Sequence, residues 1–424
     1  MSIILFKNAT LIDGTGAKPV EHSAIAIEDD KIIFTGSMEN WHVPEGKSVQ
    51  EFDMTGRTIL PGLIDCHVHI AAECLPDSTM NGPWGWTTLI MLKHAQNTLS
   101  AGITTIRDVG GRHHLEFSLR KAVEAGLFVA PRMSLAGKLL SITCAGSEWY
   151  DGMYREADGV EEVRKAAREQ LKAGADLIKV LATGAVLSPG EKPGAATFEL
   201  EEIRAAVVEA QKVGKIVAAH AHGIEGIRNA VEAGAKTIEH GTYLSQDPLV
   251  MERMAKENIF LVPTLKAGYD VIYGDRPGIP QWIMEKSKET QEDAMRSIRK
   301  AYEMGVPIAM GTDAATPYNF HGENAMELYY MSQAGISTMD CIVASTKNAA
   351  KALGWDSRIG TLEAGKLADL LIVKKNPLDD LRSLADRTNI EYVMQNGKFV
   401  ARQYSDASGI PEELMAGAWI CCGF

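Results

Sequence analysis

A repeated unit of helix, glycine and short apolar strand constrains the fold of this chain more than any other sequence feature. A helical stretch ends in Ala-Gly or Met-Gly before a strand-like run at five places: 101–102, 125–126, 173–174, 233–234 and 304–305. Glycine at such a place supplies the left-handed cap that ends a helix. Repeated units without long hairpins between them predict parallel strands. About eight such units favour an α/β fold with a closed (β/α)₈ TIM-like barrel over an open, doubly wound sheet.

The two ends of the chain have a different, all-β texture. Three apolar, β-prone runs separated by turns lie between Ile3 and Gln50. Strands return after Arg358, and the pair Asn396-Gly397 is a strong hairpin signal. We therefore predict a small β-sandwich domain from residues 1–57 and 358–406, a barrel over 58–357 and a C-terminal tail over 407–424.

Charge and composition narrow the class of protein. The net charge of -12 disfavours nucleic acid or an anionic membrane as the main partner. We find no signal-peptide pattern in Met1 to Lys7 and no charge-free apolar run of transmembrane length. The six cysteines are scattered without a Cys-x-x-Cys pair, which favours reduced thiols. We expect a cytoplasmic enzyme. The absence of Gly-x-Gly-x-x-Gly after the first strand counts against dinucleotide binding.

Four histidines stand at the ends of predicted strands. His67 and His69 are two residues apart, so they point to the same face of their strand. His220 and His240 each end another predicted barrel strand. In a barrel these strand ends meet at the active-site mouth. A single strand-end histidine is more often structural, but four at the ends of three parallel strands indicate a metal site.

Two further residues extend this group. Asp313 ends the last barrel-type strand, where a carboxylate can bind a metal and accept a proton from water, or can cap the following helix. Lys179 interrupts the apolar run Leu177–Leu181, where a lysine is rare. It can be a buried ion-pair partner or an amine neutralised by desolvation. A neutral amine can also add carbon dioxide to give a carbamate that bridges two metal ions. The residues alone do not choose among these.

The motifs together resemble the amidohydrolase superfamily over the whole chain. Within it they resemble the imidazolonepropionase-related branch that contains prolidase-like Xaa-Pro dipeptidases and N-acyl-amino-acid hydrolases. The segments with this resemblance are Leu60–His69, Gly102–Asp108, Leu177–Lys179, His220–Gly223, Ile238–Thr242 and Gly311–Ala314.

The resemblance implies two divalent metal ions, with zinc as the expected ion. It implies that His67 and His69 bind one metal with Asp313, and that His220 and His240 bind the other. A carboxylated Lys179 would bridge the two. The implied metal ligands are therefore His67, His69, Lys179, His220, His240 and Asp313. We also expect a homo-oligomer.

Two more residues gain roles from the resemblance. His222 is expected to contact the substrate or to support the ligand His220, and Tyr243 resembles a phenol that contacts the substrate's carboxylate or scissile carbonyl. The loop Thr143–Ser147 departs from a Gly-Gly-His-Gly-like loop of many members, so a substrate-contacting histidine is missing there. Trp149-Tyr150 stands nearby and would favour a bulky or aromatic acyl or amine group. Arg107-Asp108, at a strand end, is expected to form an ion pair at the rim.

The expected reaction is hydrolysis of the amide of small carboxylate-bearing substrates, Xaa-Pro dipeptides or N-acyl amino acids, by a metal-bridging hydroxide. Asp313 would take the proton from the water and pass it to the leaving nitrogen, and Tyr243 would assist the carbonyl oxygen. An imidazolonepropionase-like cyclic-amide hydrolase or a deaminase is the alternative. Single-metal members usually lack the strand lysine, so Lys179 argues against them. A non-catalytic scaffold typically loses ligands, and none of the six is lost here.

Overall fold

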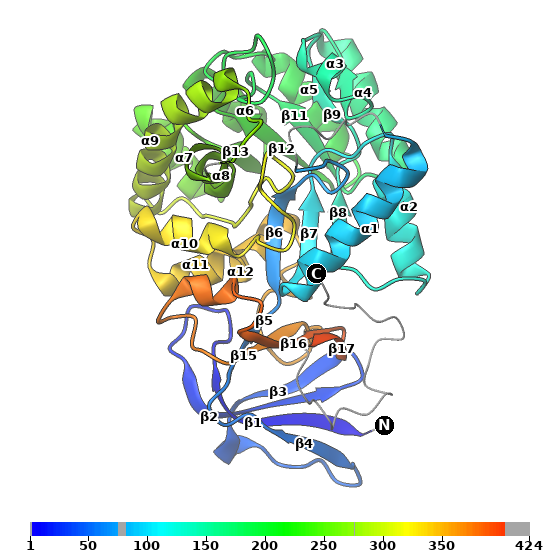
Figure 1. Ribbon diagram of the computed structural model, residues 1–424, viewed down its shortest axis with the longest axis vertical. Helices are drawn as coiled ribbons and strands as arrows, with labels where there is room; N and C mark the ends of the chain where they lie inside the picture. Colours follow the sequence, from blue (N-terminus) through cyan, green and yellow to red (C-terminus); the bar gives the residue numbers. More distant parts are fainter. Residues whose placement is uncertain (1, 75–81, 275, 403–424) are drawn as a thin grey trace.

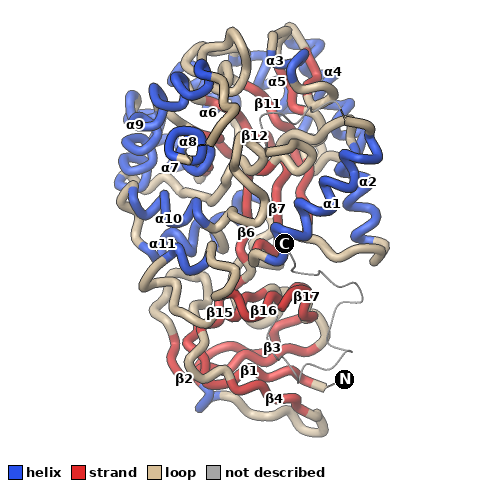
Figure 2. Tube along the Cα trace, viewed as in Figure 1, coloured by secondary structure: helices blue, strands red, loops and turns tan. Residues whose placement is uncertain are grey.

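Strands from both ends of the chain meet in one sheet. The computed structural model describes residues 2–74, 82–274 and 276–402, so the tail at 407–424 lies outside the described residues. The sheet has the order β17-β16-β15-β5-β1-β2-β3, and β4 pairs with β1 (Figures 1 and 2). Antiparallel pairing of β5 with β15 joins the two ends. The strands are β1 (Ile3–Leu11), β2 (Val20–Glu28), β3 (Lys31–Ser37), β4 (Val49–Asp53), β5 (Thr58–Pro61), β15 (Leu370–Val373), β16 (Ile390–Gln395) and β17 (Lys398–Arg402).

The middle of the chain forms two sheets of parallel strands. One has the order β6-β7-β8 and the other β10-β9-β11-β12-β13-β14. Their bounds are β6 (Leu63–Val68), β7 (Ile103–Asp108), β8 (Arg132–Leu135), β9 (Leu139–Ser141), β10 (Tyr154–Glu156), β11 (Leu177–Leu181), β12 (Ile216–Ala221), β13 (Thr237–His240) and β14 (Phe260–Val262). The segment 307–314 bonds to both sheets. Ile308 forms a parallel bridge with Leu261 of β14, and Met310 O accepts the backbone N–H of Cys66 of β6 at 2.9 Å.

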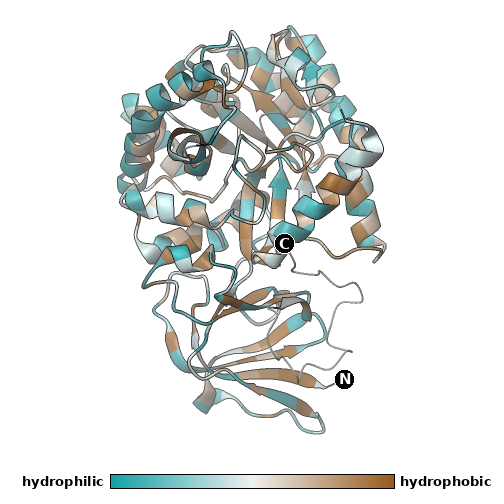
Figure 3. Cartoon of the chain, viewed as in Figure 1, coloured by the Kyte–Doolittle hydropathy of each residue, from teal (hydrophilic) through white to brown (hydrophobic). Residues whose placement is uncertain are grey.

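Helices lie outside the parallel strands (Figure 1). They are α1 (Trp84–Ser100), α2 (Leu115–Glu124), α3 (Gly146–Trp149), α4 (Val160–Ala173), α5 (Leu200–Gln211), α6 (Ile224–Ala233), α7 (Pro248–Glu257), α8 (Leu265–Tyr273), α9 (Gln281–Glu303), α10 (Met326–Gln333), α11 (Thr338–Ala344) and α12 (Lys347–Leu353). In Figure 3 the strands are mainly hydrophobic and many outer helix faces are hydrophilic. None of the described helices combines the length and apolarity needed to cross a membrane.

The predicted glycine caps are confirmed and explain the direction of the strands. Gly174 ends α4 and Gly234 ends α6 with φ of 106° and 99°. This left-handed conformation reverses the chain into β11 and β13, which lie on either side of β12 in parallel pairs. The repeated reversal places the carboxyl ends of successive strands at one end of the sheets.

Candidate metal centre

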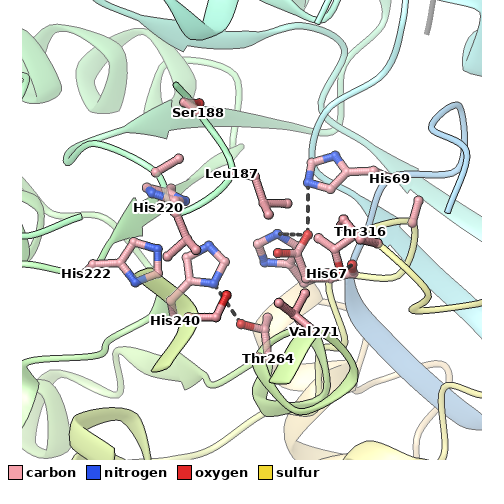
Figure 4. A pocket seen from close by; sticks show the side chains of 18 of the residues that line it. His67, His69, Leu187, Ser188, His220, His222, His240, Thr264, Val271 and Thr316 are labelled. Carbon is pink, nitrogen blue, oxygen red and sulfur yellow. Dashed lines mark hydrogen bonds and ion pairs between the residues drawn. The ribbon is translucent and has the colours of Figure 1, made fainter. Parts of the chain in front are cut away.

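The strand-end residues singled out in the sequence line one cavity of about 240 Å³. His67 lies on β6 and His69 directly follows it, while Lys179 lies on β11. His220 and His240 lie on β12 and β13. Figure 4 shows the four histidine rings gathered around one space. The parallel order of these strands therefore brings together side chains that are up to 173 positions apart in the chain.

Asp313 joins the first pair of histidines. Its Oδ1 lies 3.5 Å from His67 Nε2 and 3.4 Å from His69 Nε2, the contacts dashed in Figure 4. Its backbone N–H donates to His67 O at 2.7 Å, which fixes Asp313 beside β6. The φ of Asp313 is 58° and that of His240 is 69°, a left-handed conformation that non-glycine residues adopt infrequently and that clusters at functional sites. Burial raises the pKa of Asp313 to about 7.

Two groups of side chains here have the proximity of metal ligands. One is His67, His240 and Asp313, and the other is His220, His222 and His240, with ligand atoms within 4.8 Å of one another in each group. His222 was expected to contact the substrate or to support His220. The structure stacks its ring on His240 at 4.6 Å and places it 4.7 Å from His220, and it also lines the cavity.

Hydrogen bonds orient the histidine rings. His67 Nδ1 lies 2.8 Å from Glu239 Oε2, and His69 Nδ1 lies 3.2 Å from Gly110 O. His240 Nδ1 lies 2.7 Å from the Thr264 hydroxyl, which itself donates to Pro263 O. Each partner accepts, so each Nδ1 donates its N–H and leaves Nε2 as the acceptor. Such bonds fix the tautomer of metal-binding histidines.

Lys179 has an isolated amine. The side chain is 1% exposed, and Nζ has no hydrogen-bond partner among the described residues. No ion pair of Lys179 occurs there either, which removes the ion-pair interpretation for the described part of the chain. Burial lowers the pKa of Lys179 to about 8, against the raising effect of Glu239 and Asp313. An amine of lowered pKa is neutral in a larger fraction of molecules, as carbamate formation requires.

The predicted ion pair between Arg107 and Asp108 is wrong. Successive side chains of a strand point to opposite faces, so these two neighbours on β7 cannot face each other. Asp108 accepts the backbone N–H groups of Ile70 at 2.7 Å and Gly110 at 3.0 Å. Arg107 is fully buried, and its Nη2 donates to Glu239 Oε1 at 2.8 Å.

Glu239 contacts the candidate site and was missed by the sequence reasoning. It connects the Arg107 guanidinium to the His67 ring, and it is fully buried. The Thr237 hydroxyl also donates to Glu239, and it accepts a hydrogen bond from Arg107 Nη1 at 3.1 Å. The available signal was an acidic residue inside the buried strand Thr237–His240, next to a predicted ligand.

Tyr243 is not among the described residues that line the cavity, although its neighbour Thr242 is. Burial raises the pKa of Tyr243, and so do the charges of Asp293 and Glu289 on α9. Its expected contact with the substrate stays a prediction.

The rest of the cavity wall is largely apolar. Trp149 and Tyr150, which stand after the altered loop, both line it. The Tyr150 hydroxyl donates to Leu187 O at 3.3 Å, and burial raises the pKa of Tyr150. Val271 of α8 and Ile283 of α9 line the cavity as well. Figure 4 shows Leu187 and Val271 among the histidines.

Comparisons with known proteins identify the family of the chain. The model of the amidohydrolase family matches residues 58–400. The chain is 30% identical over 420 residues to an ochratoxinase of Aspergillus niger, covering 92% of this chain and 84% of that protein. It is 25% identical over 409 residues to an imidazolonepropionase of Hyphomonas neptunium, covering 86% and 91%. The crystal structure of a Xaa-Pro dipeptidase with bound methionine superposes with a TM-score of 0.85 and 32% identity, covering 94% and 99%.

Proposed function

Because the chain belongs to the amidohydrolase family, we propose that it hydrolyses the amide bond of small substrates, such as N-acyl amino acids or Xaa-Pro dipeptides, with two divalent metal ions. The family and its relatives make the chain a hydrolase of amide or peptide bonds. The two-metal centre and the substrate class are the proposal. A (β/α)₈ barrel is part of it, supported by the bonds of segment 307–314 to both parallel sheets.

The observation behind the two-metal proposal is the donor set of the cavity. His67, His69 and Asp313 would hold one ion, and His220 and His240 the other. The buried Lys179 Nζ without a partner fits a carbamate that bridges them. Imidazole and carboxylate donors suit zinc, which is the ion we propose. When bound, two such ions acidify a water molecule and polarise the substrate carbonyl.

The residues of the chain supply the remaining chemistry. Asp313 has a carboxylate whose Oδ1 lies within 3.5 Å of His67 Nε2 and His69 Nε2, and such a positioned carboxylate can take a proton and return it. It would receive the proton of the attacking water and give it to the leaving nitrogen, since an amine leaves poorly as an anion. Glu239 and Thr264 hold the rings of His67 and His240 in one tautomer.

Asp313→Asn tests this proposal. We expect the variant to lose at least a hundredfold in kcat, because the amide cannot accept the proton. Asp356→Asn is the control, since Asp356 is an exposed aspartate outside the cavity. Metal content and the hydrolysis of N-acyl amino acids and Xaa-Pro dipeptides are measured for both. Full activity of a metal-loaded Asp313→Asn would refute the proton-transfer role.

An imidazolonepropionase-like activity is the second candidate, favoured by the 25% identity to that enzyme. Lys179 favours the two-metal amide hydrolase instead. Metal analysis separates them, because close to two ions per chain supports the first function and close to one supports the second.

A further inference from the structure

We propose that the cavity recognises its amide substrate by uncharged apolar groups on both sides of the scissile bond and does not require a substrate carboxylate. This inference rests on the proposed amide hydrolysis and names the substrate class for it. It differs from the expectation drawn from the sequence, in which a free carboxylate was part of the substrate.

Two apolar walls line the same cavity as the candidate metal centre. Trp149, Tyr150 and Tyr154 form an aromatic wall from the segment that follows β9. Val271 of α8 and Ile283 of α9 form an aliphatic wall. Each wall shares the cavity with the ligand histidines, so an amide at the centre would extend one group along each wall. Pockets lined in this way gain affinity from buried apolar surface.

Three polar atoms of the described cavity lining already have partners. The Tyr150 hydroxyl donates to Leu187 O. The Thr264 hydroxyl donates to Pro263 O and accepts from His240 Nδ1. Ser188 O accepts the ammonium of Lys286 at 2.9 Å. Ser188 Oγ and Gln291 Nε2 have no partner among the described residues. Both are neutral groups that can bond to the amide of a substrate, and neither supplies the charge that would compensate a carboxylate.

Apart from the proposed metal ions, the described lining has no spare cationic side chain for a carboxylate. Among the described residues, Lys179 is the only lysine or arginine that lines it, and the proposed carbamate consumes that charge. The sequence has no lysine or arginine at positions 1, 75–81, 275 or 403–424, which the structure leaves undescribed. The carboxylates on the wall are Glu73 and Asp313. Carboxylate recognition commonly uses an arginine fork, and an unpaired buried carboxylate is costly.

The two expected carboxylate or carbonyl contacts are also missing from the cavity. Tyr243 does not belong to the described lining. The histidine of the Gly-Gly-His-Gly-like loop is absent from Thr143–Ser147, and the aromatic wall begins directly after this loop. Apolar contacts from the aromatic wall thus take the place of the polar contact that the missing histidine would make.

A matched pair of substrates tests the inference on the metal-loaded full chain. N-benzoyl-L-phenylalanine and N-benzoyl-2-phenylethylamine differ only in the carboxylate. We expect the neutral amide to be hydrolysed with a kcat/KM at least equal to that of the acid. N-acetyl-2-phenylethylamine should be at least tenfold slower, because it lacks the ring for one wall. A tenfold or larger preference for the acid, or equal rates for the acetyl and benzoyl amides, would overturn the inference.

A pair of variants tests the charge argument independently. Trp149→Arg places a cation at the cavity wall, and Trp84→Arg is the matched control on α1, outside the lining; the two tryptophans are 54% and 60% exposed. We expect the preference for the acid over the neutral amide to rise at least fivefold in Trp149→Arg and to stay unchanged in Trp84→Arg. Equal preferences in the two variants would overturn the inference. If the enzyme hydrolyses no amide of either series, the proposed function itself fails, whereas an active enzyme that prefers the acid refutes only the apolar recognition.

Discussion

Replacing Glu239 by glutamine should destabilise the fold and weaken metal binding together. The carboxylate is fully buried and accepts from Arg107 Nη2 at 2.8 Å, while its other oxygen lies 2.8 Å from His67 Nδ1. Glutamine keeps the shape but removes the charge, so the buried guanidinium of Arg107 loses its counter-ion. Breaking a buried ion pair costs about 3–5 kcal/mol. Because glutamine still accepts one hydrogen bond, we expect a loss of about 3 kcal/mol in the free energy of unfolding.

The matched control is Glu209→Gln on α5. Glu209 also pairs with several cations, but Arg168 and Lys212 are 57% and 54% exposed. Exposed pairs contribute about 0–1 kcal/mol each, so this variant should lose clearly less. Urea unfolding of metal-free protein, followed by tryptophan fluorescence, measures both losses.

Metal affinity gives a second and independent readout of the same change. Partners of metal-binding histidines typically contribute 10–100-fold to affinity. We therefore expect about a tenfold or larger rise in the zinc Kd of Glu239→Gln and no change in Glu209→Gln. Equal unfolding free energies and equal Kd values in the two variants would refute the argument that Glu239 compensates Arg107 and orients His67.

Three further predictions concern single groups. Lys179→Ala should lose metal and activity, and added propionate should restore part of both; a variant that holds two metals unaided would contradict the carbamate bridge. Glu116 is buried with no partner for either oxygen among the described residues, and burial raises its pKa to about 8. Because the carboxyl of Glu116 has a higher pKa in the folded state than in the unfolded state, its protonation contributes to the free energy of unfolding. This contribution is complete below about pH 4.5 and is lost as the pH rises towards 8. Glu116→Gln should therefore gain stability relative to wild type between pH 5 and pH 8 in urea titrations, and a constant difference would contradict this. Tyr243→Phe should keep kcat/KM within threefold, because the phenol lies outside the described cavity lining; a hundredfold loss would instead support the catalytic role expected from the sequence.

The gathering of the four strand-end histidines in one cavity was predictable from sequence because their chemistry and their local pattern coincide. His67, His69, His220 and His240 each follow an apolar run, and parallel strands bring such ends together. Glycine caps such as Gly174 gave the direction of the strands by the same local logic.

The residues that orient these ligands were not predictable, because their partners are distant in the chain. Arg107 and Glu239 are 132 positions apart, and nothing local to Arg107 distinguishes that partner from the neighbouring Asp108. Thr264 likewise meets His240 only because β13 ends at His240 and Thr264 follows the neighbouring strand β14. Such contacts depend on strand order and side-chain direction, which periodicity alone does not reveal.

The pairing of β5 with β15 has a consequence for synthesis on the ribosome. Leu60 pairs with Leu371, so the partner of β5 is made about 300 residues later. At 5–20 residues per second this delay is about 15–60 s. Throughout that time β5 presents an unpaired apolar edge, the kind of surface that attracts other nascent strands. The terminal sheet is therefore the last part of the nascent chain to close. Until then the unpaired edge of β5 is the surface to which we expect a chaperone to bind.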